Sequence, residues 1–167
     1  MSRERVHKSA RWLALAAAIV VADQLTKWLI LSYFAGRPPR EEITGFFNLV
    51  LVFNKGAAFS FLAQAPGWQT PLLAAFALVA ALIVSVLIVR NPGKLLFCVG
   101  LAGILGGALG NLIDRLRFGQ VVDFLDFHAL GWHWPPFNVA DSAITVGAAL
   151  LILEGFFHHE GRARTAS

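Results

Sequence analysis

Two aspartates lie in otherwise apolar sequence, and their surroundings point to acid/base chemistry. Asp123 follows Val122, and Asp141 lies three residues after Asn138. A carboxylate beside lipid costs at least about 2.5–3.5 kcal/mol on insertion scales, so it needs a partner, a wet cavity or a function. Two carboxyls brought together share a proton and can act as an acid/base pair, which is the chemistry of aspartic proteases.

The elements that must position these acids are membrane-length apolar segments. The chain has 167 residues, of which 57% are hydrophobic and 14% charged, a composition typical of membrane proteins. Four apolar runs, near 12–33, 71–89, 95–113 and 139–157, approach the roughly 20 residues that cross a bilayer. We therefore expect an all-α polytopic membrane protein with four transmembrane helices, in which residues 1–167 form a single membrane-embedded domain.

The basic residues favour one orientation of these four spans, which place both termini on the same side of the membrane. The side with the termini carries Arg3, Arg5, Lys8, Arg11, Arg90, Lys94, Arg162 and Arg164, and the other side carries Arg37, Arg40, Lys55, Arg115 and Arg117. This excess predicts that both termini are cytoplasmic and that the loops at 34–70 and 116–138 face outward. The basic flanks also indicate contact with anionic membrane lipid, and no basic-aromatic pattern suggests nucleic acid.

The first outward loop has the composition of a strand. Residues 48–54 are mostly β-branched or aromatic, which predicts a short strand or hairpin followed by a turn that Gly56 permits. The loop is too apolar for a solvated linker, so we expect a small extracytoplasmic β-rich platform on the membrane surface. Asn54 is the polar group of this loop most suited to a functional contact.

Three of the four spans also carry polar residues at helical spacing. In the first span, Asp23 and Lys27 are four residues apart, which predicts an internal ion pair that orients the helix and can also position catalytic or substrate groups. In the fourth, Asn138 and Asp141 share a face with Ser142 and Thr145. Asp126, three residues after Asp123, fits a loop acid better than a site residue.

The third span combines glycines with a polar triplet. The glycines form two overlapping pairs, Gly103 with Gly107 and Gly106 with Gly110. The polar triplet that follows them is Asn111, Asp114 and Arg115. Small residues four apart let another helix approach closely. A close helix contact that ends in this triplet predicts a polar pocket at the outer boundary, whereas an Asp–Arg pair alone is also common at a membrane interface.

Other hydrolytic chemistries lack the residues they need. The five histidines do not have the His-Glu-x-x-His spacing of a zinc protease. Ser60 and Ser142 lack the context of a serine nucleophile, although the sequence alone leaves Lys27 open as a partner. Cys98 is the single cysteine, so no internal disulfide forms.

Two further alternatives concern the class of protein and its first span. A small transporter or lipid-binding scaffold would also use buried acids, but transporters usually show repeated halves with broken spans, and no such repeat is evident. The basic start followed by 13–22 resembles a cleavable signal peptide. However, the apolar run resumes after Lys27, and cleavage would leave Asp23 unexplained.

Five segments in chain order resemble the lipoprotein signal peptidase (signal peptidase II) family. They are Asp23-Gln24-Leu25-Thr26-Lys27, Asn54-Lys55-Gly56-Ala57-Ala58-Phe59, the run 106–115 ending in Asn-Leu-Ile-Asp-Arg, Val121-Val122-Asp123-Phe124, and Phe137-Asn138-Val139-Ala140-Asp141-Ser142. Each alone is weak, but five in order with four spans cover nearly the whole chain. The tail after Glu154 carries no mark of the family.

The resemblance implies an aspartyl endopeptidase of the bacterial inner membrane, with its active site near the outer face. Its substrate would be a prolipoprotein that carries diacylglycerol on a lipobox cysteine, and it would cut just before that cysteine. It would act as a monomer and need no metal or other cofactor.

The same resemblance implies a role for each matching residue. Asp123 and Asp141 would form the catalytic dyad, and the sequence does not indicate which of them is protonated. The supporting and substrate-binding residues would be Asp23, Lys27, Asn54, Gly56, Asn111, Asp114, Arg115, Asn138 and Ala140. Among these, Asn54 and Arg115 would contact the lipid-modified substrate, and the platform loop would clamp it from above.

Overall fold

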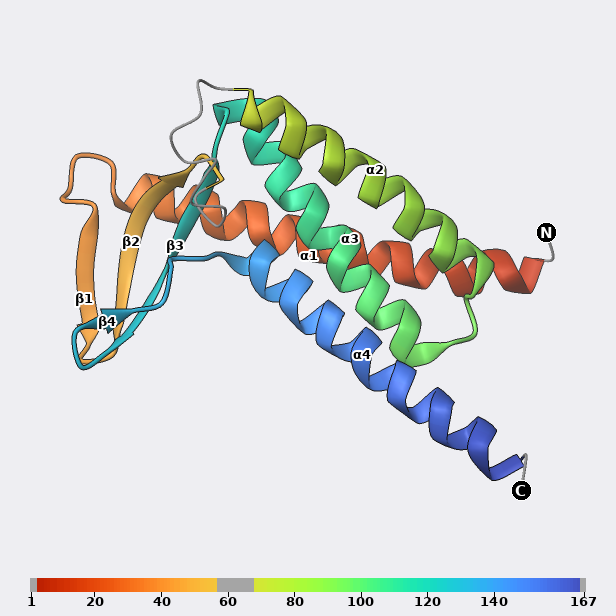
Figure 1. The fold of residues 1–167 in the computed structure, drawn as a ribbon. Coiled ribbons are helices and arrows are strands. Elements are labelled where there is room, and N and C mark those ends of the chain that lie inside the picture. Colours follow the sequence, from red (N-terminus) through yellow and green to blue (C-terminus); the bar gives the residue numbers. More distant parts are fainter. Residues whose placement is uncertain (1–2, 57–67, 166–167) are drawn as a thin grey trace.

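Four long helices and a four-stranded antiparallel sheet make up the part of the chain that the computed structural model describes, residues 3–56 and 68–165 (Figure 1). In chain order the elements are α1 (Arg3–Tyr33), β1 (Arg40–Thr44), β2 (Phe47–Asn54), α2 (Gln69–Arg90), α3 (Leu95–Phe118), β3 (Val121–Ala129), β4 (Trp132–His133) and α4 (Val139–Thr165). All four helices are long and apolar enough to cross a membrane, which confirms the expected spans.

The helices extend beyond the apolar segments that predicted them. Helix α3 continues past residue 113 and ends at Phe118, where Gly119 adopts a left-handed conformation, φ 71°, and donates its N–H to the carbonyl of Arg115 at 3.0 Å. The polar triplet of the third span therefore lies inside the last turns of a helix. Helix α1 begins before its apolar segment, with a polar turn in which Lys8 pairs with Glu4.

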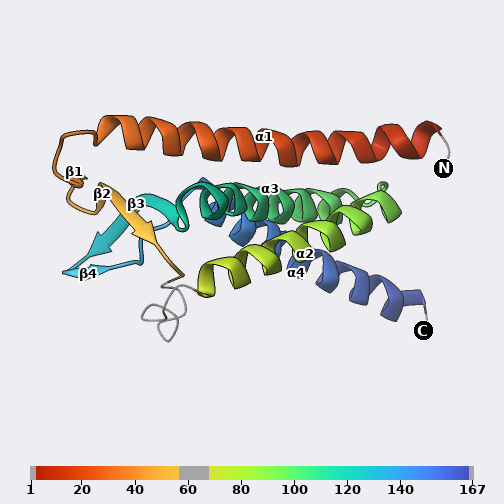
Figure 2. The ribbon, with the colours of Figure 1, turned by 90° about the horizontal axis from the view of Figure 1, so that it is seen from above.

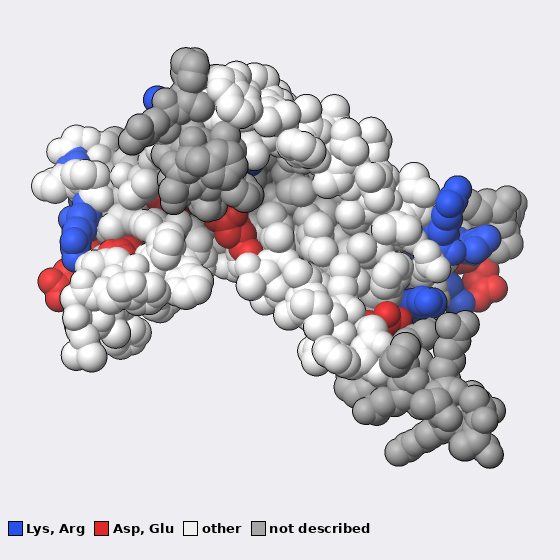
Figure 3. All heavy atoms as spheres, viewed as in Figure 1, with Lys and Arg blue, Asp and Glu red and all other residues white. Residues whose placement is uncertain are grey.

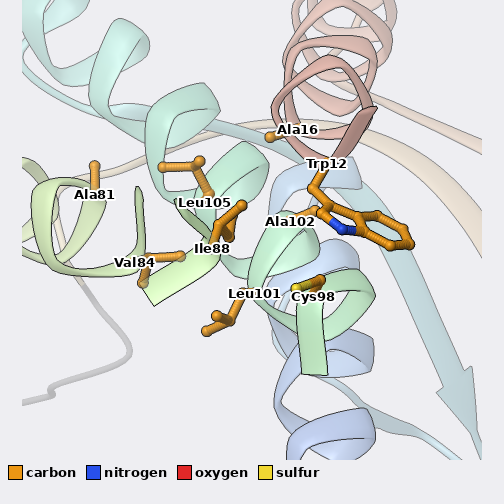
Figure 4. Close-up of a cluster of buried hydrophobic side chains, with 9 residues drawn as sticks. All are labelled: Trp12, Ala16, Ala81, Val84, Ile88, Cys98, Leu101, Ala102 and Leu105. Atoms are coloured by element: carbon orange, nitrogen blue, oxygen red, sulfur yellow. The ribbon is translucent and has the colours of Figure 1, made fainter. Parts of the chain in front are cut away.

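Helix α3 is the centre of the bundle and contacts each of the other three helices (Figures 1 and 2). Where α1, α2 and α3 meet, an apolar cluster fills the core, and Figure 4 shows its nine residues: Trp12, Ala16, Ala81, Val84, Ile88, Cys98, Leu101, Ala102 and Leu105. Cys98 and Ile88 are fully buried within it. This end of the bundle is held by packing of small and branched side chains.

The glycines of α3 let its neighbours approach closely, as the paired spacing predicted. Gly103 and Gly107 face α4, and a Cβ at Gly107 would lie 2.3 Å from the carbonyl oxygen of Ala140. Gly106 and Gly110 face α1, and a Cβ at Gly110 would lie 2.6 Å from Oδ2 of Asp23. Each predicted pair thus serves a different partner helix.

The sheet joins two regions of the sequence that are separated by α2 and α3. The predicted strand at 48–54 is confirmed as β2, which pairs with β1 on one side and with β3 on the other. In this register Val52 lies opposite Asp123. The strand β3 was not predicted, because its partner is distant in the chain and no turn signal links the two.

Asp126 is a buried strand residue, so its interpretation as a loop acid was wrong. Its carboxylate accepts a hydrogen bond from Asn48 Nδ2 at 2.7 Å and contacts Nδ1 of His133 at 2.8 Å. Burial raises the pKa of Asp126, but these two hydrogen bonds together with the charges of His133 and Arg40 outweigh it and keep that pKa below its usual value. His128 and His133, also expected in a loop, lie on β3 and β4 with stacked rings.

The two ends of the molecule carry different parts of the chain, and most of the charged side chains lie at these ends. Both termini lie at one end of the helical body, and the sheet lies at the opposite end (Figures 1 and 2). On the face shown in Figure 3, charged side chains gather at these two ends, with an almost uncharged surface between them. This distribution is that of a protein whose middle lies in lipid.

Candidate active site

Asp123 is held by two amide side chains at the point where β3 meets the helices. Its Oδ2 accepts a hydrogen bond from Asn54 Nδ2 at 2.9 Å, and its Oδ1 accepts one from Asn138 Nδ2 at 2.7 Å. Asn54 ends the neighbouring strand β2, so the sheet pairing brings the two residues together. The side chain is 1% exposed, and the two bonds satisfy a carboxyl that has little access to water.

Asp141 lies in the first turn of α4 and forms a reciprocal cap with Asn138. Oδ1 of Asn138 accepts from the backbone N–H of Asp141 at 2.9 Å, and the N–H of Asn138 donates to Oδ2 of Asp141 at 3.3 Å. Asn111 Nδ2 donates to the other carboxylate oxygen at 2.7 Å. The positive end of the helix dipole further favours a negative charge at this position.

Asn138 therefore contacts both predicted catalytic acids, and the two carboxyls line one cavity of about 900 Å³. Its walls come from β2, α2, α3, β3, the segment before α4, and α4 itself. They include Val52, Phe53, Asn54, Gly56, Leu73, Asn111, Arg115, Asp123, Trp134, Pro135, Asp141, Ser142 and Val146. In Figure 3, acidic atoms are visible where the sheet meets the helical body. The structure thus places both acids in one partly apolar chamber.

The surroundings of Asp123 favour its protonated form. Burial raises the pKa of Asp123, the hydrogen bond from Asn54 lowers it, and the nearby charge of Asp141 raises it again. The net result is a pKa of about 7. A carboxyl with this pKa can hold a proton at neutral pH and give it up during a reaction.

Lys27 connects the site to a buried ion network. Its Nζ lies 2.9 Å from carboxylate oxygens of both Asp23 and Asp114, and it donates to Oδ1 of Asn111 at 3.0 Å. An ammonium group can only donate, so the amide oxygen of Asn111 must face Lys27. The NH₂ group of Asn111 is then directed to Asp141.

Two acids of this network each bind the backbone just before a predicted catalytic aspartate. Asp23 accepts the N–H of Ala140 at 2.9 Å, and Asp114 accepts the N–H of Val122 at 3.0 Å. Asp23 thereby fixes the start of α4, and Asp114 fixes the start of β3. Ala140 is fully buried, and a Cβ at Gly107 of α3 would lie 2.3 Å from its carbonyl oxygen.

Gln24 belongs to the same network, a role that was not predicted from the sequence. Its Nε2 donates to Asp114 Oδ1 at 2.9 Å and lies 3.2 Å from the carbonyl of Gly110. The sequence does contain a signal for this role, because Gln24 is a polar residue inside a membrane span and directly follows Asp23.

The remaining predicted residues border the cavity. Gly56 has φ 112°, which favours glycine, and its N–H donates to Oδ1 of Asn54 at 2.8 Å. This bond directs the NH₂ group of Asn54 to Asp123. Arg115 is half-buried beside the cavity, and its Nη1 lies 3.3 Å from the carbonyl of Asn111. Phe59 and the rest of 57–67, which belong to the expected platform, lie outside the described residues.

Comparison with known proteins gives one family. Its profile, described as signal peptidase (SPase) II, matches residues 15–157. A lipoprotein signal peptidase of Paraburkholderia phytofirmans is 57% identical over 145 residues, 87% of this chain and 84% of that protein. One of Ralstonia nicotianae is 56% identical over 148 residues, 89% of this chain and 85% of the relative.

Two solved structures, both described as bacterial membrane enzymes, share the fold. The first has a TM-score of 0.77 and 27% sequence identity, and the match covers 91% of each chain. The second has a TM-score of 0.74 and 28% identity, and the match covers 87% of this chain and 92% of the solved chain. Because the family profile matches most of the chain and both relatives are at least 56% identical to it, the chain belongs to the signal peptidase II family.

Proposed function

We propose that Asp123 and Asp141 are the catalytic dyad of this aspartyl endopeptidase, which removes signal peptides from prolipoproteins. The observation that carries the proposal is the position of Asn138, whose side chain bonds to Asp123 and caps the turn that holds Asp141. Carboxyls that share one cavity and one hydrogen-bonding partner can act on the same bound substrate.

The two acids have different roles in this proposal. Asp123, with its raised pKa, is the protonated member, and Asp141, at a helix N-terminus, is the ionised one. Asp141 takes a proton from water as the water oxygen bonds to the scissile carbonyl carbon. At the same time Asp123 gives its proton to the carbonyl oxygen, which leaves a neutral tetrahedral diol.

The second half of the reaction restores both acids. The bond between carbon and nitrogen breaks, and Asp141 gives the proton it gained to the leaving nitrogen. Asp123 takes a proton from one hydroxyl of the diol, so the product is a carboxylic acid and the original protonation states return. These steps use no metal or cofactor, and activity without a metal remains a prediction. Two further predictions are that the protein acts as a monomer and that it does not bind nucleic acid.

The buried network holds the dyad in position. Asp23 binds the backbone before Asp141 and Asp114 binds the backbone before Asp123, while Lys27 pairs with both carboxylates and orients Asn111. Gly56 orients Asn54 in the same way on the other side of the dyad. Two separate contacts thus present amide NH₂ groups to the two catalytic carboxyls.

We further propose that the cavity receives a prolipoprotein whose lipobox cysteine carries diacylglycerol, and that cleavage occurs just before that cysteine. Val52, Phe53 and Leu73 supply apolar walls, and Asn54 and Arg115 supply donors beside them. The lipid tails are already in a membrane, so the enzyme gains little from burying them. Discrimination then comes from hydrogen bonds to the head of the lipid and to the peptide backbone.

The proposed orientation places this site at the outer face of the bacterial inner membrane. The sheet and the cavity lie at one end of the bundle, and both termini lie at the other (Figure 1). The more basic end, which also holds Arg5, Lys8, Arg90 and Lys94, is then cytoplasmic.

Asp123→Asn and Asp141→Asn should each abolish cleavage, because an amide cannot transfer the proton. The expected loss is roughly 10²–10⁴-fold or more in kcat on a diacylglyceryl lipobox peptide, with thermal unfolding in detergent used to show that the protein still folds. Asp126→Asn is the matched control, since Asp126 is a buried acid three residues along the same strand and should leave turnover near the parent value. Substantial turnover in either dyad variant would remove that residue from the dyad.

Arg115→Ala and Asn54→Ala should each lower kcat/KM for the lipidated peptide by about tenfold or more, because each removes a donor worth roughly 1–3 kcal/mol. The control is Arg117→Ala, two residues further along α3 with its side chain exposed. A parent rate in both test variants would contradict the recognition proposal while leaving the dyad intact.

A further inference from the structure

A second hollow lies at the end of the bundle farthest from the sheet. It has a volume of about 360 Å³ and lies between the first turns of α1 and the turn that joins α2 to α3. Its charged lining residues are Arg5, Lys8, Arg90, Lys94 and Glu4. Figure 3 shows basic side chains gathered at this end of the molecule. The catalytic proposal uses none of these residues.

The charge of this hollow is strongly positive. Among the described residues that line it, four cations face one carboxylate, and Glu4 is already 2.6 Å from Lys8. Arg11, one turn further along α1, adds another cation nearby and stacks its guanidinium on Trp12 at 4.2 Å. A negatively charged group is the chemical complement of such a site.

Hydrogen bonds between distant parts of the chain fix the walls of the hollow. Arg5 Nη2 donates to the carbonyl of Arg90 at 2.9 Å, and Trp12 Nε1 donates to the carbonyl of Pro92 at 3.0 Å. The second bond is buried, so α1 is tied firmly to the α2–α3 turn. These bonds fix the position of the turn against α1 and hold Arg5 beside it.

The end of α2 and the start of α3 both border the hollow, through Arg90 and Lys94. Lys94 precedes α3 in an extended conformation and makes no side-chain capping bond, and the first turn, Leu95–Cys98, contains no acid. The positive end of the α3 dipole lies beside the negative end of the α2 dipole, so the attraction for an anion comes from the basic side chains.

Three exposed apolar side chains are next in the chain to residues of the hollow or one position further. Val6 is 46% exposed, and Leu95 and Leu96 at the start of α3 are 61% and 39% exposed. A free anion would make no use of these side chains, whereas the acyl chains of a phospholipid would cover them while its phosphate met the cations.

We propose that this hollow binds the headgroup of an anionic phospholipid. The phosphate lies among Arg5, Arg90 and Lys94, and the acyl chains run along the exposed leucines of α3. A lipid bound there joins α1 to the α2–α3 turn and stabilises the end of the bundle that contains the apolar cluster of Trp12 and Ile88. The proposal does not depend on the catalytic assignment or on which face of the membrane this end occupies.

Native mass spectrometry of the delipidated protein in detergent tests this proposal. Phosphatidylglycerol and phosphatidylcholine with identical acyl chains are added separately, and the first should bind more tightly by roughly tenfold, since each basic contact near a lipid surface contributes about that order of effect. The variant Arg90→Gln with Lys94→Gln should lose this preference. The control, Arg37→Gln with Arg117→Gln, removes the same charge at the opposite end and should keep it.

Thermal unfolding of each variant in detergent shows whether it is folded. If the Arg90 and Lys94 variant does not fold, Lys94→Gln alone is measured and should show a smaller loss of preference. Equal binding of the two lipids by the parent, or an unchanged preference in the folded variants, would overturn the proposal. Full displacement of phosphatidylglycerol by inorganic phosphate at the same concentration would also overturn it, because the site would then select only an anion.

Discussion

The two ends of the helical bundle use the same helices in opposite ways. At the end near the termini, α1, α2 and α3 enclose a cluster of apolar side chains such as Trp12 and Ile88. At the end near the sheet, α1 and α3 enclose Asp23, Lys27 and Asp114, none of them more than 2% exposed. A buried ion network is often no more stabilising than apolar residues of similar size. Its presence beside the two proposed catalytic acids is therefore better explained by the proposed catalysis than by stability.

Helix α1 contains the same contrast in a simpler form. Lys8 pairs with Glu4 and Lys27 pairs with Asp23, both at a spacing of four residues. The first pair has side chains 45% and 76% exposed, and the second has side chains 3% and 0% exposed. Identical spacing thus produces a solvated surface pair in one place and part of a buried ion network in the other, and burial makes the difference.

Lys27→Met should have the largest effect of the variants that compare these regions. It leaves Asp23 and Asp114 buried without their cation, which costs about 3–5 kcal/mol in the free energy of unfolding. It should also lower kcat, because Asn111 loses the contact that orients its amide toward Asp141. Unfolding in detergent and cleavage of a lipidated peptide measure the two effects.

Lys8→Met is the matched control for this substitution. An exposed ion pair contributes about 0–1 kcal/mol, so the free energy of unfolding should change little and kcat should not change. Similar losses in the two variants would show that burial does not separate the two pairs.

Ile88→Ala should have a smaller effect than Lys27→Met, and it should change only the free energy of unfolding. It removes fully buried atoms from the apolar cluster, which costs about 2–5 kcal/mol in soluble cores. The lower end of that range is expected here, since lipid replaces water as the surrounding solvent. The rate per folded molecule should equal that of the parent, and a selective fall in kcat would mean that the apolar end takes part in catalysis.

Local spacing explains why much of this fold and site was predictable. The four spans follow from apolar runs, and helical periodicity alone placed Asp23 with Lys27, and Asn111 with Asp114, on common faces. The glycine pairs of α3 also predicted close contact with neighbouring helices. These features depend on residues a few positions apart.

Contacts between segments far apart in the chain could not be predicted from the sequence. Strand β3 and the burial of Asp126 follow from pairing with β2, and no local pattern shows that pairing. The hydrogen bonds from Asp23 to the start of α4 and from Asp114 to β3 also join separate elements. Sequence spacing identified the polar residues but could not assign their partners.

The pH dependence of kcat/KM for a diacylglyceryl lipobox peptide tests most directly whether the two acids share one proton. Asp123 has a pKa raised to about 7, so it holds its proton below that value and loses it as the pH rises through it. Above pH 7 both carboxyls are then ionised, and no acid remains to protonate the scissile carbonyl. The account predicts that kcat/KM falls above about pH 7, approaching tenfold for each further pH unit. A rate that stays constant to pH 9, with the protein still folded, would contradict it.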